Sequence, residues 1–183
     1  MSADPHRWGV AELSAQLAAK AVSSAEVTSH LLARVAAHEH LGAFLCTDAS
    51  VSKTFLRTVL REEVETTFNA VSVDGDTSTN DMVAIMASGA AKNKPIDGGD
   101  KGKAFRQAVH DVLDELARQI VRDGEGATHV VTIEVAGAEN SAAGDAVARR
   151  IAQSPLCKAA FFGADPNWGR ILAAIGNSGV DID

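Results

Sequence analysis

One glutamate lies where a short turn between two regular segments would fix its position. Glu125 has Gly124 on one side and Gly126 on the other, and glycines here let the backbone take positive φ and approach a bound group closely. A carboxylate held on such a turn can anchor an amino or ammonium group. Spacing alone leaves two interpretations open: Glu125 as this anchor, or Glu125 as a solvated turn residue.

Two other patterns suggest metal binding at first sight. His38 and His40 are two residues apart on a predicted helix, which places them on opposing faces. The polar run at 74–81 resembles a calcium loop, but it lacks the glycine at position six and the glutamate at position twelve. We therefore predict no metal site, and nothing in the sequence calls for a cofactor.

The elements that must position Glu125 alternate between helix and strand. After Glu125, the residues Val131, Ile133 and Val135 share one face of a predicted strand. Thr47 and Asp48 are expected to cap the helix that follows a first buried strand. The expected elements are a helical hairpin at 9–39, a strand at 41–47, a helix to about 69, a strand at 70–73, and helices at 82–91 and 105–121; then a strand at 130–135, a helix at 142–152, a strand at 157–162 and a helix at 171–175. Such alternation indicates a layered α/β or α+β fold, in which a loop near 92–103 divides two sublobes.

Composition excludes several classes of protein. The net charge of −7 and the aromatic content of 4% argue against nucleic-acid binding. No window holds a long uninterrupted apolar run, so no segment is expected to span a membrane, and the N-terminus lacks the order of a secretory signal. Cys46 and Cys157 are expected to be reduced and buried, as in a cytoplasmic protein.

The first part of the chain carries one resemblance. The sequence GVAELSAQLAAKAVSSAEVTSHLLARVAAHEHLGAFL is similar to the N-terminal helical segment of the A subunit of glutamyl-tRNA amidotransferase, an amidase-signature enzyme. The similarity covers about residues 8–45. In that family the segment is helical scaffold, so it implies no catalytic residue here.

The rest of the chain, about residues 41–180, resembles a second family on three phrases together. VSVDGDTSTND at 71–81, IVRDGEGAT at 120–128 and FFGADPNWGRILAAIG at 161–176 look like the bifunctional ornithine acetyltransferase, or glutamate N-acetyltransferase. The resemblance implies a four-layer α-β-β-α sandwich. It also implies acetyl transfer from N-acetylornithine to glutamate in arginine biosynthesis, without a cofactor. The nucleophile would be an N-terminal threonine freed by self-cleavage of the precursor into two chains.

The sequence departs from this pattern at defined positions. Where the family has its nucleophilic threonine, this chain has His40, preceded by Glu39. The resemblance gives Glu125 a substrate-binding role, and His129 stands where a lysine is usual. The regions that supply the oxyanion hole and further substrate contacts have no counterpart in the sequence. We therefore expect a chimera-like chain, with an amidase-like hairpin at 1–40 and a fragment of the acetyltransferase fold at 41–183.

Three functional hypotheses follow. A rebuilt acyltransferase or amide hydrolase site would use Thr47 or Cys46 as the nucleophile, although an N-cap and a buried thiol are the simpler explanations of these two residues. A non-catalytic remnant would bind a small amino acid near Glu125. An interaction module would self-associate into a homo-oligomer through apolar surface left uncovered.

Overall fold

The computed structural model of the protein describes residues 19, 43–78 and 81–181. The chain forms two compact units, one from Met1–Arg61 with Ser78–Gln107, the other from Glu62–Thr77 with Ala108–Asp183. The helical hairpin expected at 9–39, with His38 and His40, lies outside the described residues. The division into an N-terminal hairpin and two sublobes stays a prediction.

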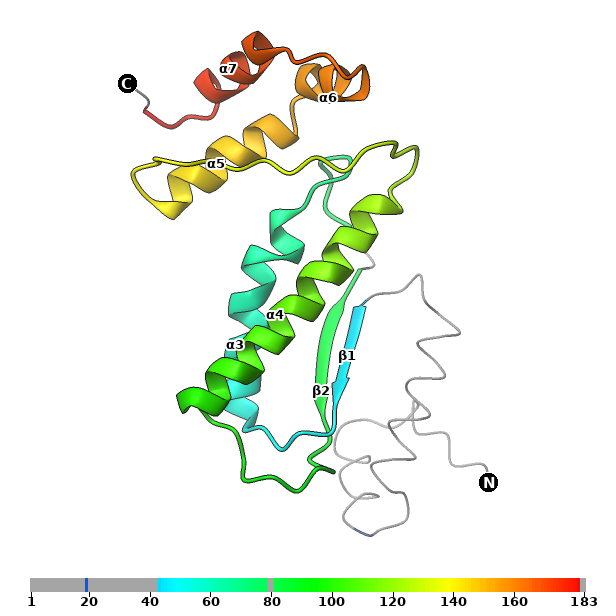
Figure 1. Ribbon diagram of the computed structural model, residues 1–183, viewed down its shortest axis with the longest axis vertical. Coiled ribbons are helices and arrows are strands. Elements are labelled where there is room, and N and C mark those ends of the chain that lie inside the picture. The colour runs from blue at the N-terminus through cyan, green and yellow to red at the C-terminus, as the bar shows by residue number, and fades with distance from the viewer. Residues whose placement is uncertain (1–18, 20–42, 79–80, 182–183) are drawn as a thin grey trace. The chain divides into compact units, whose positions relative to one another are not determined.

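A pair of parallel strands forms the sheet of the first unit. Strand β1 (Ala43–Thr47) pairs with strand β2 (Val83–Ala87), with Ala43 opposite Val83 and Thr47 opposite Ala87. Parallel strands need a long crossover, and here it contains helix α3 (Lys53–Thr66) and the short 3-10 helix η3 (Phe68–Ala70). Figure 1 shows β1 and β2 side by side.

Strand β2 corrects the helix predicted at 82–91. The five residues of β2 are all half-buried, and the ladder extends past its end because the Ser88 amide donates to the Thr47 carbonyl at 2.9 Å. Val83 and Ile85 are β-branched and fit a half-buried pleated surface. Pairing with β1 thus makes this segment a strand.

Helix α3 begins later than expected, which corrects the assignment of its cap. The Ser52 hydroxyl accepts from the Phe55 amide at 3.3 Å, whereas the Thr47 hydroxyl accepts from the Ala49 amide at 3.1 Å in a local turn. Ser52 therefore caps α3, and Thr47 does not. The 70–73 strand is also absent from the described residues, because the chain there passes from η3 into turns.

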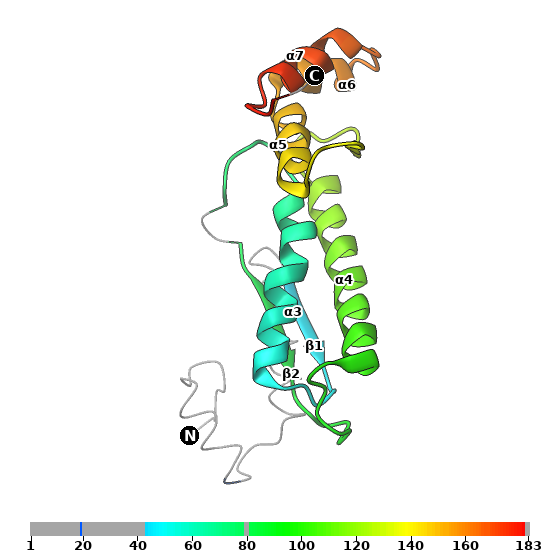
Figure 2. The ribbon, with the colours of Figure 1, turned by 90° about the vertical axis from the view of Figure 1, so that its left-hand side faces the viewer.

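Helices α3 and α4 (Gly99–Arg122) lie side by side in both ribbon views (Figures 1 and 2). The helix predicted at 105–121 is thus confirmed, and it begins within the loop expected at 92–103. Phe55 of α3 and Phe105 of α4 have ring centroids 6.4 Å apart. Apolar residues of the two helices are buried, namely Val59, Val109, Leu113 and Ala117.

Three helices end the second unit. They are α5 (Ser141–Ala152), α6 (Pro155–Phe162) and α7 (Trp168–Gly176), which confirms the helices predicted at 142–152 and 171–175. Their shared core contains Val147, Ile151, Cys157 and Ala174. Cys157 is buried as predicted, whereas Cys46 is exposed, which corrects the expectation that both thiols are buried.

Helix α6 corrects the buried strand predicted at 157–162. Pro155 occupies the first turn, and the Ser154 hydroxyl accepts from the Cys157 amide at 3.3 Å as the N-cap. Cys157 and Ala160, three residues apart, are buried, while Leu156 and Phe162 are exposed. This is helical spacing, and a short apolar run does not by itself distinguish a strand from a buried helix.

The segment at 127–136 forms no regular helix or strand in the described part of the chain, which corrects the strand predicted at 130–135. Ile133 and Val135 are half-buried against the core of the C-terminal helices. Val130 and Val131 are exposed. The prediction that Val131, Ile133 and Val135 share one face is therefore confirmed for Ile133 and Val135 and is wrong for Val131.

Candidate functional site

The turn that holds Glu125 follows directly from the end of α4. The Asp123 amide donates to the Gln119 carbonyl at 2.9 Å, and the Ala127 amide donates to the Gly124 carbonyl at 2.9 Å. Gly126 has φ +73°, a conformation in which a Cβ is costly. The turn thus holds Glu125 at its tip, where the residue is exposed.

Gly124 is required for a different reason than Gly126. A Cβ built on Gly124 would lie 2.8 Å from Cγ1 of Val73 and 3.2 Å from the Val121 carbonyl oxygen. Both distances are shorter than ordinary van der Waals contact. The turn therefore approaches Val73 more closely than any residue with a side chain would allow.

Val73 belongs to the phrase at 71–81, and it is itself held from another direction. The Lys158 ammonium of α6 donates a hydrogen bond to the Val73 carbonyl oxygen. Next to it, Gly75 has φ +97°, and the Asp74 carboxylate accepts from the Asp76 amide at 2.8 Å. Residues 74–76 thus form a tight local turn.

A second cationic side chain reaches the same part of the chain. Arg149 of α5 donates to the Asn69 carbonyl oxygen at 2.8 Å. Segment 69–77 is therefore tied to two helices through its backbone carbonyls. Lys158 and Val73 were not singled out from the sequence. The available signal was Ser154-Pro155, which begins a helix and places Lys158 in its first turn.

The phrase at 161–176 folds as a turn that opens α7. The Asn167 side chain caps this helix by accepting from the Arg170 amide at 3.2 Å, and it donates to the Asp165 carboxylate at 3.0 Å. Arg170 in turn donates to the Leu156 carbonyl at 3.0 Å. The polar residues of this phrase therefore bind one another and join α6 to α7.

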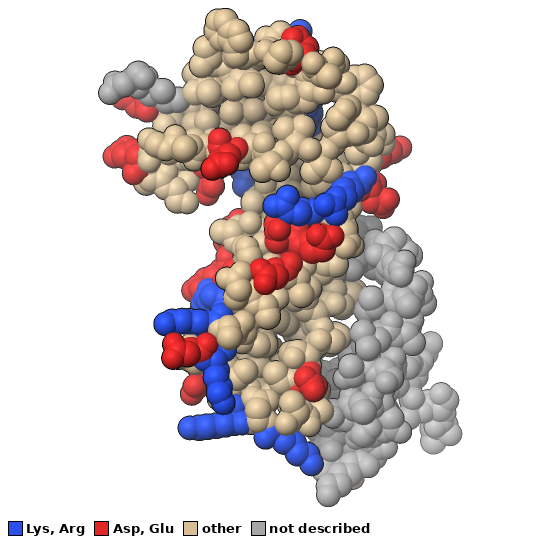
Figure 3. Space-filling model, in the orientation of Figure 1, with Lys and Arg blue, Asp and Glu red and all other residues tan. Residues whose placement is uncertain are grey.

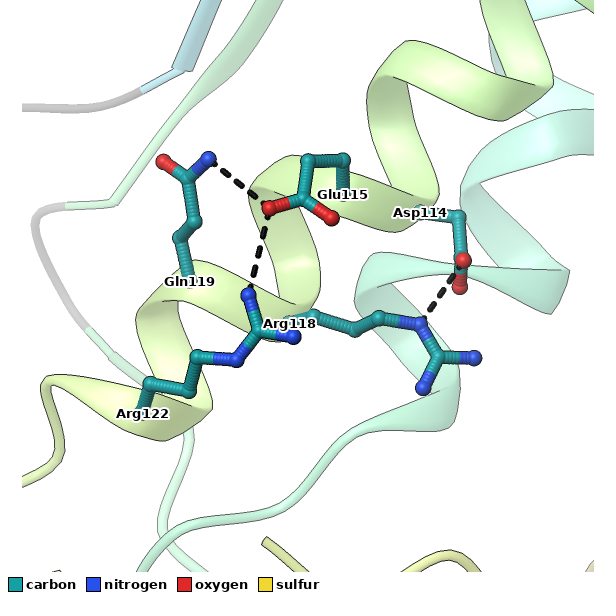
Figure 4. Close-up of polar contacts among 5 residues, drawn as sticks. All are labelled: Asp114, Glu115, Arg118, Gln119 and Arg122. Atoms are coloured by element: carbon teal, nitrogen blue, oxygen red, sulfur yellow. Dashed lines mark hydrogen bonds and ion pairs between the residues drawn. The ribbon is translucent and has the colours of Figure 1, made fainter.

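The last turns of α4, just before Glu125, carry two pairs of opposite charges (Figure 4). The pKa of the Glu115 carboxyl is lowered by a hydrogen bond from Gln119 and by Arg122, whose guanidinium lies 3.2 Å away. The pKa of Arg118 is raised by its hydrogen bond to Asp114 at 2.8 Å. These cations are thus paired with carboxylates of their own helix.

Thr47 and Cys46, the candidate nucleophiles, lie in β1. The Thr47 hydroxyl is engaged with the Ala49 amide. Partial burial raises the pKa of the Cys46 thiol, which lowers the thiolate fraction at neutral pH and so its reactivity. Both residues belong to the first unit and Glu125 to the second.

His129, beside the turn, is exposed, with Nδ1 2.8 Å from Oγ1 of Thr128.

Neither a metal centre nor a membrane span is found in the part of the chain that the structure describes. There, no three or more His, Cys, Asp or Glu side chains gather in a way that could hold a metal ion. Its helices are also too short or too polar to cross a bilayer.

One open hollow of about 310 Å³ lies between 133–138 and the start of α5, lined by Asn140, Ser141 and Asp145 among others.

A sequence model of the ArgJ family matches residues 40–183. The chain belongs to the ArgJ family. The arginine biosynthesis bifunctional protein ArgJ of Thermus thermophilus is 52% identical over 141 residues, which are 77% of this chain and 35% of that protein. Its counterpart from Desulfotalea psychrophila is 50% identical over 142 residues, 77% of this chain and 36% of that protein.

A solved structure agrees with these matches. The crystal structure of ArgJ from Bacillus halodurans superposes with a TM-score of 0.75 at 45% identity, covering 78% of this chain and 67% of that one. The mixed α/β arrangement described above is thus consistent with a fragment of the ArgJ fold. The chain spans about a third of the length of the curated ArgJ relatives it matches. Residues 1–39 lie outside the family match.

Proposed function

We propose that this chain is an ornithine acetyltransferase-like protein of arginine biosynthesis that lacks the covalent step of the family and keeps one part of its substrate binding, in which Glu125 binds an amino group. The ArgJ relatives carry arginine biosynthesis in their names, and the resemblance at 120–128 assigns Glu125 to the substrate. The single observation that carries the proposal is the geometry of the turn. Gly124 and Gly126 hold an exposed carboxylate at its tip, where an ammonium group can reach it.

The strength of this interaction can be bounded. A solvent-exposed pair between a carboxylate and an ammonium group contributes about 1 kcal/mol or less. Glu125 is exposed, so we expect this chain to bind N-acetylornithine only weakly, with a Kd of about 1 mM or higher.

The covalent step is proposed to be missing. His40 occupies the position at which the resemblance places the threonine nucleophile, and an imidazole there does not form the ester of an acetyl-threonine enzyme. We expect the intact mass of the chain to stay unchanged after incubation with N-acetylornithine. A gain of one acetyl unit, mapped to Thr47, Cys46 or another residue, would contradict this part of the proposal.

The test of binding is an NMR titration of the whole chain with N-acetylornithine, comparing Glu125→Gln with Glu134→Gln. Both glutamates are exposed in the second unit, so the second variant controls for the loss of one negative charge. We expect Glu125→Gln to abolish the shifts that N-acetylornithine causes in the turn and Glu134→Gln to leave them. Equal chemical-shift changes in the parent chain, Glu125→Gln and Glu134→Gln would show that Glu125 is not the anchor.

We also propose that the chain self-associates. Leu156, Phe162, Trp168 and Leu172 of α6 and α7 are 60%, 69%, 73% and 56% exposed. On the face shown in Figure 3 the surface over these helices is mostly uncharged. An apolar surface of this kind favours contact with another protein chain. A strictly monomeric species in size-exclusion chromatography at high concentration would refute this proposal.

The origin of residues 1–39 is a further part of the proposal. They lie outside the ArgJ match, and their resemblance to the amidotransferase A subunit makes them an amidase-like helical hairpin joined to an ArgJ segment. Circular dichroism of the full chain and of a version that starts at residue 40 tests this. We expect the longer chain to contain more helix, and equal helical content would contradict a hairpin.

A further inference from the structure

The position of the Glu125 turn depends on a contact from a distant part of the sequence. Lys158 and Val73 are 85 residues apart, and the Lys158 ammonium donates to the Val73 carbonyl oxygen. Hydrogen bonds from a charged donor are stronger than those between neutral groups. The backbone of Val73 is therefore attached to the first turn of α6.

The Val73 side chain then determines how close the Glu125 turn can lie. Its Cγ1 and Cγ2 are 2.8 and 3.6 Å from the place where a Cβ of residue 124 would stand. Val73 is β-branched, so its side chain is stiff at χ1 and cannot easily turn away. A displacement of Val73 therefore changes the surface on which Gly124 rests.

We propose that Lys158 is a positioning residue for Glu125: it holds Val73, and Val73 sets the place of Gly124 and of the carboxylate next to it. This inference rests on the proposed function, because Glu125 is the group whose binding it serves. Lys158 itself is not proposed to touch the substrate.

Arg149 offers a matched control. Like Lys158, it is a cation of a C-terminal helix that donates to a backbone carbonyl of segment 69–77, but its acceptor is Asn69, four residues before Val73. Substitution of either residue by methionine removes one positive charge and one hydrogen bond to the same segment. Only the loss of the Lys158 bond is expected to move Val73.

The experiment compares Lys158→Met, Lys158→Arg and Arg149→Met in the full chain, with N-acetylornithine as the probe. For Lys158→Met we expect the Kd to rise about three- to five-fold, because the exposed pair that Glu125 forms with the ammonium group contributes about 1 kcal/mol or less. The amide resonances of Gly124 and Gly126 should shift even without the probe. Lys158→Arg keeps a donor and should stay within about two-fold of the parent chain, as should Arg149→Met.

A second variant keeps the test independent of the lysine. Val73→Ala keeps the carbonyl that accepts from Lys158 but removes the methyl groups against Gly124, so it should shift the same two amides. The inference is overturned if Lys158→Met leaves these amides unchanged, or if Arg149→Met shifts them equally. If the parent chain fails to bind N-acetylornithine, the proposed function fails, while the amide shifts still decide whether Lys158 positions the turn.

Discussion

Gly102 of α4 and Gly124 of the turn after it each lie against one apolar side chain. The two contacts differ in how easily the neighbouring atoms can move away from an added methyl group. A Cβ on Gly102 would lie 3.0 Å from Cζ of Phe55, at the far end of a side chain. A Cβ on Gly124 would lie 2.8 Å from Cγ1 of Val73 and 3.2 Å from a backbone oxygen. The end of the Phe55 side chain can shift, whereas the Val121 backbone oxygen beside Gly124 cannot.

The difference separates a packing contact from a positioning contact. Phe55 packs on Phe105 with the ring planes tilted at 46°, and it meets Gly102 with the far end of its side chain. Val73 is tied through its carbonyl to Lys158, and Val121 is part of the helix that ends at the turn. Gly124 is thus bounded by a backbone oxygen on one side and by the side chain of a tethered residue on the other, which is the arrangement expected where a side chain must be held in place.

The largest effect should follow from Gly124→Ala. The new methyl group has no space, and overpacking of this kind costs about 1–3 kcal/mol. Urea denaturation measures the change in the free energy of unfolding. Gly144→Ala is the control, because its Cβ would meet Ala138 at an ordinary 3.5 Å, and it should leave stability equal or raise it. Equal stability of the parent chain and Gly124→Ala would show that the contact is not tight.

A smaller effect should follow when Val73→Ala is added to Gly124→Ala. Removal of both Cγ atoms makes room for the methyl group, except toward the Val121 carbonyl oxygen. We expect a favourable coupling energy of about 0.5–1.5 kcal/mol in the double-mutant cycle. The same urea measurements provide all four corners of the cycle. Strictly additive changes would mean that Val73 does not limit the turn.

Gly102→Ala should change the free energy of unfolding by about 0.5 kcal/mol or less. Alanine is the better helix former by about 0.5–1 kcal/mol, and this gain should offset the displacement of the Phe55 ring. Thermal unfolding followed by circular dichroism checks the prediction. A loss as large as that of Gly124→Ala would remove the contrast between the two glycines.

The smallest effect concerns the acid side of the pH profile. The pKa of Glu115 is lowered in the folded chain, first by Gln119 and then by Arg122. A lowered pKa contributes stability above the carboxyl pKa of the unfolded chain, and this contribution is lost as the pH falls through the folded pKa. Glu115→Gln should therefore flatten the fall in stability with acid slightly, most visibly at low salt. An unchanged profile would contradict the pairing shown in Figure 4.

The turn itself could be predicted from the sequence, but its surroundings could not. Gly124 and Gly126 were expected to allow positive φ and close approach; the structure gives the first property to Gly126 and the second to Gly124. The group approached is Val73. A contact between residues 73 and 158 has no local signature, because 85 positions separate them.

The regular elements show where local patterns suffice. Helix α4 has an apolar stripe long enough to predict a helix from the sequence alone. The segments at 83–87 and 157–162 are short apolar runs, for which length and periodicity do not decide. In β2 the partner strand determined the outcome, and in α6 the cap at Ser154 did. Cys46 follows the buried Leu45 in β1 and is exposed, and a short apolar run does not show which of its side chains is covered.

The parallel pairing of β1 and β2 has a consequence for how the chain is made. Ala43 and Val83 are partners in the sheet but are 40 residues apart (83 − 43), and closing a loop of this length costs about 3 kcal/mol of chain entropy. During synthesis β1 is made before its partner strand. Helix α3, a local structure, can form in that interval, so the sheet is expected to be among the later parts of the first unit to appear.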